Sequence, residues 1–257
     1  MGAMILHVSE SGEGQPLVLL HGLFGAARNL GVLVRALSPL YRVIAMDLRN
    51  HGESPHDPQM DYASMAGDVA QTLETMGHTN IRLCGHSMGG KTAMMLALSR
   101  PDLVSHLAVM DIAPVTYGHN YAHFVTAMQA IPLEASLTRA QAEQTLATVV
   151  KEAPLRAFLL NNLVLGAQPY WRIGLDEIGA NMGSLFRWDD PANMKPFAQP
   201  TLFLCGAQSD YVMPSAKPAI IQRFPQANIT YVPNAAHWLH ADQPELVCTA
   251  LKAFFAP

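Results

Sequence analysis

Short apolar runs rich in β-branched residues alternate along the chain with longer stretches whose apolar residues recur at helical spacing. The helical pattern covers residues 61–76, 88–99 and 243–255. Alternation of strands and helices predicts an α/β fold, with a mostly parallel sheet covered by helices on both faces. The apolar runs predict strands at 4–8, 17–21, 42–48, 81–85, 106–112, 201–205 and 228–232.

Residues 117–190 interrupt this alternation. They carry helical patches, such as NYAHFVTAMQAI at 120–131 and RAQAEQTLATVVKE at 139–152, and no convincing strand. The segment follows a strand that ends near Asp111, so it should lie above the carboxyl edge of the sheet, where open α/β sheets form binding crevices. We therefore expect a single domain over 1–257, with 117–190 inserted in it as a helical lid.

Composition and charge narrow the class of substrate. The 257 residues are 50% hydrophobic and 14% charged, which suits a folded domain and excludes a disordered chain. The formal net charge is −4, without the basic clusters that bind nucleic acid or anionic lipid. We expect a small-molecule substrate, no nucleic-acid or membrane partner, and a monomer or homodimer.

The three cysteines and the N-terminal residues indicate in which cellular compartment the protein is expected. Three widely spaced cysteines, Cys84, Cys205 and Cys248, form neither a disulfide framework nor a zinc motif, so we expect no metal site, and Cys84 and Cys205 sit in apolar runs as core thiols. The first ten residues lack the pattern of a signal peptide, which predicts a cytoplasmic protein. The sequence leaves open whether residues 1–3 are native.

The most informative segment is GHSMG at 85–89, a Gly-x-Ser-x-Gly motif between a predicted strand and a predicted helix. The bare pattern arises by chance in about one in ten chains of this length, so its position carries the weight. A sharp strand-to-helix turn exposes the serine hydroxyl, and the flanking glycines remove side chains that would clash. We predict that Ser87 is the nucleophile and that the backbone N–H of Met88, at the positive end of the helix, stabilises an oxyanion.

A serine hydroxyl needs a base to activate it and an acid to orient that base. The order serine, acid, histidine is usual for such an elbow, so the base should follow Ser87. His237 lies after the last predicted strand, on a small-residue loop that can fold back over the elbow, and we favour it over His240, which we expect to support the loop. The histidines that follow Ser87 are His106, His119, His123, His237 and His240.

Two further glycine-bearing loops follow predicted strands. In LVLLHGLFG, the dipeptide His21-Gly22 lets the backbone N–H of Leu23 face a scissile carbonyl as second oxyanion donor; an ordinary turn is the alternative. We interpret DLRNHGESP at 47–55, including His51-Gly52, as a structural loop of the cleft wall.

Five segments together resemble the bacterial YbfF-type esterases, relatives of the mammalian abhydrolase-domain-containing 11 proteins of the α/β-hydrolase superfamily. The resemblance spans almost the whole chain and is weakest from about 118 to 195. It implies the α/β-hydrolase fold and hydrolysis of acyl esters, with acyl-CoA thioesters as further substrates, without a metal or organic cofactor. The segments are HGLFG at 21–25, DLRNHGESP at 47–55, GHSMGGK at 85–91, DIAPVTY at 111–117 and HWLHADQP at 237–244.

The resemblance also implies an unusual position for the triad acid. Most α/β-hydrolases carry it three residues after a glycine that ends the next-to-last strand, and that spacing from Gly206 leads to Ser209. The YbfF-type pattern instead takes the acid from the preceding strand, at Asp111, and gives Ser209 an accessory hydrogen-bonding role. Asp210 is a second carboxylate in contention. We favour Asp111, because its apolar run LAVMDIAP would bury it and a buried carboxylate requires a partner.

The same triad supports more than one chemistry. A lyase or a carbon–carbon hydrolase is the alternative to an esterase, and a non-catalytic ligand receptor is the alternative from another class. An epoxide hydrolase or dehalogenase would need a carboxylate in place of Ser87. The residues expected to line the substrate pocket are Phe24, Phe124, Met128, Phe158, Trp171 and Trp238. For those in the lid, the alternative is that they form the lid's own small core.

Overall fold

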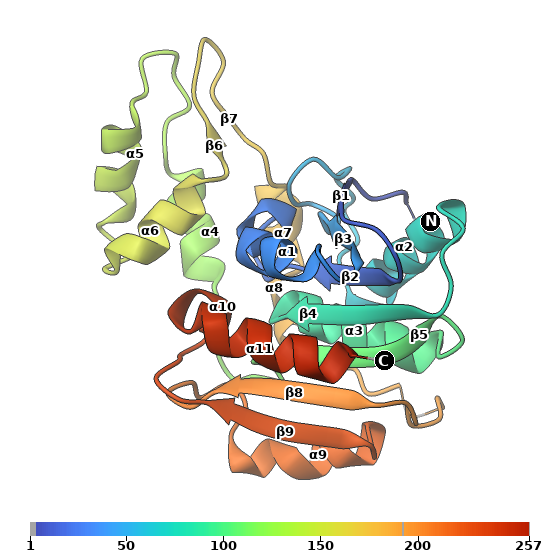
Figure 1. The fold of residues 1–257 in the computed structure, drawn as a ribbon. Helices are drawn as coiled ribbons and strands as arrows, with labels where there is room; N and C mark the ends of the chain where they lie inside the picture. Colours follow the sequence, from blue (N-terminus) through green and yellow to red (C-terminus); the bar gives the residue numbers. More distant parts are fainter. Residues whose placement is uncertain (1–3, 192, 257) are drawn as a thin grey trace.

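A seven-stranded sheet forms the centre of the computed structural model, which describes residues 4–191 and 193–256 (Figure 1). The strand order is β1-β3-β2-β4-β5-β8-β9. β1 pairs antiparallel with β3, and the other neighbouring pairs are parallel, so the predicted mostly parallel sheet is confirmed. The strands are β1 (Val8–Ser11), β2 (Pro16–Leu20), β3 (Arg42–Met46), β4 (Ile81–His86), β5 (Val104–Met110), β8 (Thr201–Gly206) and β9 (Ala227–Val232).

The strand expected at 4–8 is wrong, because the edge strand β1 begins only at Val8. The backbone N–H groups of Met4 and Leu6 donate to side chains of helix α2, at 2.9 Å to Asp68 Oδ1 and 3.0 Å to Thr72 Oγ1. This apolar stretch therefore runs along a helix. β1 itself reads VSES and is largely exposed, so hydrophobicity does not mark it.

Helices cover both faces of the sheet. Helices α1 and α11 pack together on one face, while α2 and α3 pack together on the other (Figure 1). The three helices predicted from periodicity are α2, α3 and α11, each within two residues of its expected ends. The helices outside the insertion are η1 (Ala27–Leu30), α1 (Gly31–Leu37), α2 (Tyr62–Thr75), α3 (Met88–Ser99), η2 (Pro214–Ala216), α9 (Lys217–Arg223), α10 (Leu239–Asp242) and α11 (Pro244–Phe255).

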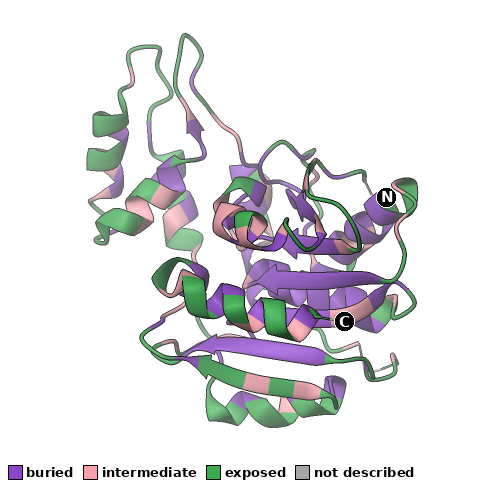
Figure 2. Ribbon diagram, viewed as in Figure 1, coloured by how far each residue is buried: buried purple, intermediate pink, exposed green. Residues whose placement is uncertain are grey.

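The core explains why the central strands read as continuous apolar runs. Every residue of β4 and β8 is buried, because helices shield both faces of these strands (Figure 2). Two apolar clusters, one on each face, contain the inward sides of α1 with α11 and of α2 with α3. The cysteines Cys84, Cys205 and Cys248 are buried and unbridged, and burial raises the pKa of the Cys84 and Cys205 thiols to about 12.

The segment between β5 and β8 is mainly helical, as expected. α4, α5 and α6 stand at the upper left of Figure 1, beyond the end to which the arrow of β4 points. One detail differs from the expectation of no strand: two-residue strands form an antiparallel pair, too short to leave a periodic signal. The elements are α4 (Ala122–Gln129), α5 (Arg139–Leu146), α6 (Ala153–Leu160), β6 (Leu163–Val164), β7 (Tyr170–Trp171), α7 (Leu175–Ala180) and α8 (Met182–Phe186).

Candidate active site

Ser87 occupies the sharp turn between β4 and α3. Its φ of 52° and ψ of −119° lie in a region that non-glycine residues rarely adopt. The turn is held against the next strand, because Ser87 N–H donates to Met110 O at 3.0 Å. A Cβ on Gly85 would lie 2.2 Å from Gly89 O, and one on Gly89 would lie 2.5 Å from His21 O. The glycines are therefore required by close backbone approach.

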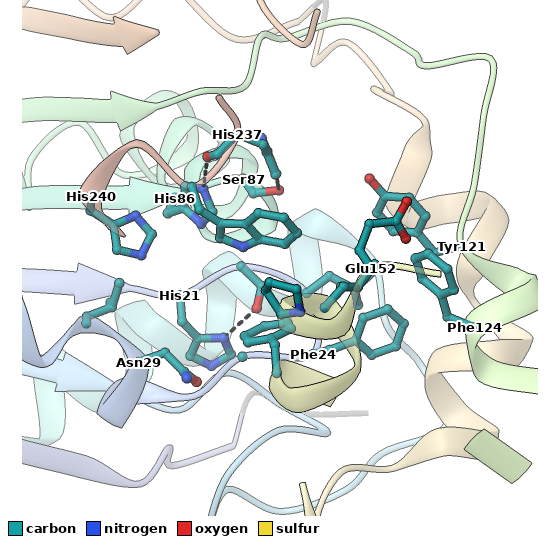
Figure 3. A pocket seen from close by; sticks show the side chains of 18 residues that line it. His21, Phe24, Asn29, His86, Ser87, Tyr121, Phe124, Glu152, His237 and His240 are labelled. Atoms are coloured by element: carbon teal, nitrogen blue, oxygen red, sulfur yellow. Dashed lines mark hydrogen bonds between the residues drawn. The ribbon is translucent and has the colours of Figure 1, made fainter. Parts of the chain in front are cut away.

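A continuous hydrogen-bonded chain joins the serine, the histidine and the aspartate predicted from the sequence. His237 Nε2 lies 3.0 Å from Ser87 Oγ, and His237 Nδ1 lies 2.8 Å from Asp111 Oδ2. Figure 3 shows Ser87 and His237 side by side at the wall of a cavity. The three residues follow β4, β5 and β9, so the carboxyl ends of these parallel strands bring them to one edge of the sheet.

Asp111 is buried, and both of its carboxylate oxygens accept hydrogen bonds. Its Oδ1 accepts from Gly206 N–H at 2.8 Å, and its Oδ2 accepts from Ser209 Oγ at 2.5 Å as well as from His237. The residue has a φ of 50°, and its N–H donates to Leu204 O on β8. Asp210, the alternative carboxylate, is exposed. The structure thus places Asp111 on the histidine and Ser209 on Asp111.

Tyr211 was not predicted from the sequence, yet it lies against the imidazole of His237. The two rings are stacked, with centroids 4.0 Å apart and planes inclined by 18°. The hydroxyl of Tyr211 lies 2.5 Å from the hydroxyl of Tyr121 and 3.1 Å from His119 Nε2. Both partners belong to the segment that precedes α4, so the insertion contacts the histidine through Tyr211.

Two buried histidines, His86 and His240, lie close to the loop that carries His237. His86 Nε2–H donates to the carbonyl of His237 at 2.8 Å. The ring of His86 lies between those of His237 and His240, at centroid distances of 4.9 Å and 4.8 Å. Burial lowers the pKa of His86 and lowers that of His240 to about 4, so both rings are neutral at pH 7. His240 contacts the ring of His86, and both rings border a cavity beside Ser87.

The turn at Gly22 and Leu23 lies beside the nucleophile. A Cβ on Gly22 would come within 3.3 Å of Ser87 Cβ, and Leu23 borders the cavity together with Ser87. Met88 begins α3, and the first N–H groups of a helix have no acceptor within it. Leu23 and Met88, the two residues predicted as oxyanion donors, therefore both lie next to Ser87.

His21 and His51 fix the shape of this turn. His51 Nε2 accepts from Phe24 N–H at 3.1 Å, and His21 Nε2 accepts from Leu48 N–H at 3.0 Å. Burial lowers the pKa of His21, and it lowers that of His51 to about 3, so both rings stay neutral and can accept. Phe24 is held at a φ of 60°. The loop at 47–55 thus contacts the turn at Gly22 and Leu23 through histidines.

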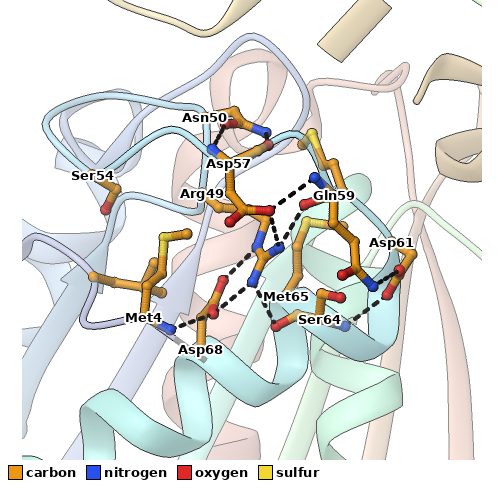
Figure 4. A network of polar contacts seen from close by, with 12 residues as sticks. Met4, Arg49, Asn50, Ser54, Asp57, Gln59, Asp61, Ser64, Met65 and Asp68 are labelled. Carbon is orange, nitrogen blue, oxygen red and sulfur yellow. Dashed lines mark hydrogen bonds and ion pairs between the residues drawn. The ribbon is translucent and has the colours of Figure 1, made fainter. Parts of the chain in front are cut away.

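A buried ion pair anchors the same loop to α2 (Figure 4). The guanidinium of Arg49 donates to both carboxylate oxygens of Asp68, at 2.6 Å and 2.8 Å, and to Gln59 O at 2.5 Å. Burial alone would lower the pKa of Arg49, but the hydrogen bonds and charge of Asp68, with Asp57 and Asp61 nearby, raise it overall, so the guanidinium remains charged. Both side chains are almost completely shielded from solvent.

A cavity of about 500 Å³, named the large cavity here, opens beside Ser87. Phe24, Phe124, Phe158 and Trp238, all predicted from the sequence as substrate-binding, line it, and Tyr121 and Leu155 are lining residues that sequence reasoning missed. Figure 3 shows Tyr121 and Phe124 across the cavity from His86 and His240.

Two residues expected in the lining lie elsewhere, which corrects the prediction. Met128, one helical turn after Phe124 on α4, is fully buried in the core. Trp171 lies on β7 and packs against the same core cluster. The alternative role stated for these lid residues, a core of the insertion, therefore applies to both.

The described residues, 4–191 and 193–256, contain no group of three or more His, Cys, Asp or Glu side chains placed to hold a metal ion. Within the same ranges, no helix combines the length and apolar character needed to cross a bilayer.

Comparison with known proteins identifies the family. Residues 15–244 match the family model described as alpha/beta hydrolase fold. The chain is 43% identical over 249 residues to the sn-1-specific diacylglycerol lipase ABHD11 of Mus musculus, covering 93% of this chain and 80% of the relative. It is 35% identical to Esterase YbfF of Escherichia coli K12, over 94% of this chain and 93% of the relative.

A solved structure called a marine microorganism esterase superposes with a TM-score of 0.94 at 34% identity, covering 98% of this chain and all of the other. The resemblance to YbfF-type esterases inferred from the sequence is confirmed by these relatives. The chain belongs to the α/β-hydrolase fold family.

Proposed function

We propose that this protein is a serine carboxylesterase that hydrolyses acyl esters through Ser87, His237 and Asp111. The observation that carries the proposal is the hydrogen-bonded chain from Ser87 Oγ through the imidazole to a buried carboxylate. Relatives named esterase and lipase support the same class of reaction. The strained turn at Ser87 adds support, because backbone strain of this kind concentrates at functional sites.

Acylation begins when Ser87 Oγ attacks the ester carbonyl and its proton passes to His237 Nε2. Asp111 Oδ2 faces Nδ1–H, so the carboxylate holds the required tautomer and stabilises the imidazolium. The backbone N–H groups of Leu23 and Met88 stabilise the oxyanion of the tetrahedral intermediate. The carbon–oxygen bond to the alcohol then breaks, and the alkoxide takes the proton from His237 Nε2.

Deacylation repeats these steps with water in place of the serine. His237 accepts a proton from the water as its oxygen attacks the acyl carbon, and the proton then passes to Ser87 Oγ as the ester to the enzyme breaks. The products are a carboxylic acid and the regenerated hydroxyl. The balance is one water consumed for each ester bond broken, without a redox step.

Ser209 acts as an accessory residue in this proposal. Its hydroxyl and the N–H of Gly206 bind the two oxygens of Asp111, which fixes the plane of the carboxylate against the imidazole. Ser209, at the position where most α/β-hydrolases carry their acid, thus acts by binding the acid instead of replacing it. We propose that the insertion, with Tyr121, Phe124 and Phe158 on its cavity side, serves as a lid over the site.

The test combines active-site labelling with ester turnover. The wild-type protein should react with a fluorophosphonate probe and hydrolyse p-nitrophenyl acetate, and acyl-CoA thioesters form the second substrate panel. Ser87→Ala should abolish labelling and leave less than about 1% of the turnover, since loss of a triad member costs several orders of magnitude. An unchanged melting temperature controls for folding. Retention of activity in Ser87→Ala, or turnover of vinylogous diketones alone, would contradict the proposal.

A further inference from the structure

Ser87 stands between two cavities. A second one, named the small cavity here, has a volume of about 20 Å³ and borders Ser87, Leu23 and Tyr121, which also border the large cavity. Its remaining wall comes from different elements, including α2, α3 and α8. This part of the wall includes Tyr62, Lys91, Tyr117, Leu185, Phe186 and Tyr211. An ester bound at Ser87 can therefore place its two halves on opposite sides of the nucleophile.

The hydrophilic groups around the small cavity are bonded to the protein. Lys91 Nζ donates to Arg187 O at 3.0 Å and to Phe186 O at 3.4 Å, and lies 4.8 Å from the centre of the Tyr117 ring. The hydroxyl of Tyr62 donates to Leu185 O, at 2.5 Å. An occupant consequently meets mainly ring faces and aliphatic carbon.

The hydroxyl of Tyr117 is also hydrogen-bonded within the protein. It donates to Tyr211 O at 2.8 Å and accepts from the N–H of Ala113 at 3.0 Å. The hydroxyls of Tyr62 and Tyr117 therefore offer an occupant no free proton, and burial lowers the pKa of Lys91 to about 7, so that the charge in the wall is weakened near neutral pH. The small cavity is thus suited to an uncharged group.

The position of the base decides which half of the ester enters which cavity. His237 borders the large cavity. The ring of Tyr211 borders the small cavity and stacks on the imidazole at 4.0 Å, so it lies between the base and the small cavity. The leaving alkoxide must take its proton from His237 Nε2. The alcohol half therefore has to lie on the side of the large cavity.

We infer that the small cavity is the acyl subsite, that the large cavity holds the alcohol half, and that the preferred substrates are esters of short, uncharged acids with bulky alcohols. This inference rests on the proposed esterase function. About 15 Å³ measured this way accommodates one water molecule, so the small cavity has room for little more than a methyl or ethyl group. The large cavity has about 25 times that volume.

The first test uses the wild-type protein and two series of esters. In p-nitrophenyl esters from acetate to octanoate, kcat/KM should be highest for acetate or propionate and at least tenfold lower for octanoate, since one misfitting methylene is worth about tenfold or more. In acetates whose alcohols increase in size but are similar in acidity, from ethyl to naphthylmethyl, kcat/KM should rise or stay level. A preference for octanoate, or rejection of naphthylmethyl acetate, would overturn the inference.

The second test is a matched pair of leucine-to-alanine variants. Leu185 borders the small cavity and Leu155 borders the large cavity. Leu185→Ala should raise the butyrate-to-acetate ratio of kcat/KM by about tenfold and leave the alcohol preference unchanged. Leu155→Ala should alter the alcohol preference and leave the acyl preference unchanged. The reverse pattern would overturn the inference.

Two controls keep the result interpretable. If Leu185→Ala does not fold, the milder Leu185→Val should shift the same ratio in the same direction, by a smaller factor. If no ester of either series is hydrolysed and the fluorophosphonate does not label Ser87, the proposed function fails. If esters are hydrolysed with a long-acyl preference, only the assignment of the two cavities fails.

Discussion

Replacing Asp111 by asparagine should disable the histidine through its tautomer. Gly206 N–H can only donate, so the amide oxygen of the new side chain must remain opposite it, and the amide nitrogen then faces Ser209 Oγ and His237 Nδ1. An N–H pointing at Nδ1 favours the ring with its proton on Nε2. That nitrogen could no longer accept the proton of Ser87, although it lies 3.0 Å from the hydroxyl.

The expected loss follows from this tautomer argument. Removal of the orienting acid from a serine triad costs about 10³- to 10⁴-fold in kcat, or about 4 to 5.5 kcal/mol in activation free energy. The assay is kcat and KM for p-nitrophenyl acetate at pH 7.5. KM should change little, because the substituted group does not border either cavity. Ser209→Ala should fall between wild type and Asp111→Asn, because it removes one of the donors to Oδ2.

Asp210→Asn is the matched control, since it makes the same chemical change on the exposed neighbouring carboxylate. We expect less than about tenfold change in turnover, or under 1.4 kcal/mol. Melting curves of both variants separate a loss of chemistry from a loss of fold. Near-normal turnover of Asp111→Asn together with collapse of Asp210→Asn would refute the reasoning and assign the acid to the commoner position.

Three further predictions concern stability and the cavity lining. Burial lowers the pKa of His51 to about 3, so its neutral ring contributes fully to the free energy of unfolding only above pH 6.5. Below that pH the contribution falls by about 1.4 kcal/mol for each pH unit, and His51→Gln should make the unfolding free energy, measured in urea between pH 4.5 and 7.5, depend less steeply on pH. Arg49→Met should cost about 3 to 5 kcal/mol by leaving Asp68 buried and unpaired, and Arg49→Met/Asp68→Leu should recover much of it in the same measurement. Met128→Ala should destabilise by about 2 to 5 kcal/mol in urea and leave substrate preference alone, whereas Phe158→Ala should shift alcohol preference in the kinetic assay with a smaller stability loss.

The elements that could be predicted from the sequence are those whose burial imposes a pattern. β4 and β8 are buried along their whole length and therefore read as uninterrupted apolar runs. β1 lies at the sheet edge with a polar sequence, and the two-residue strands β6 and β7 are shorter than any period. β1, β6 and β7 form because they pair with another strand, and the local sequence pattern carries no information about that partner.

The mutual positions of Ser87, His237 and Asp111 were predicted better than the wall of the cavity. Phe124 and Met128 are one turn apart and share a helix face, so periodicity treats them alike. In the structure, the end of α4 near Phe124 borders the cavity and the next turn enters the core. Tyr211 sits in the polar loop GAQSDYV, where nothing local marks a ring that stacks on His237. Residues that reach the site only through such tertiary contacts cannot be predicted from local patterns in a single sequence.

The sheet order explains how an acid after β5 can serve a histidine after β9. β8 lies between those two strands, so an aspartate at the end of β5 has to reach across it. The positive φ of Asp111 turns the chain sideways there, and its N–H bonds Leu204 O on β8. Aspartate tolerates this conformation better than most residues. The side chain then passes the end of β8, where Gly206 and Ser209 bind it, and an acid at position 209 becomes unnecessary.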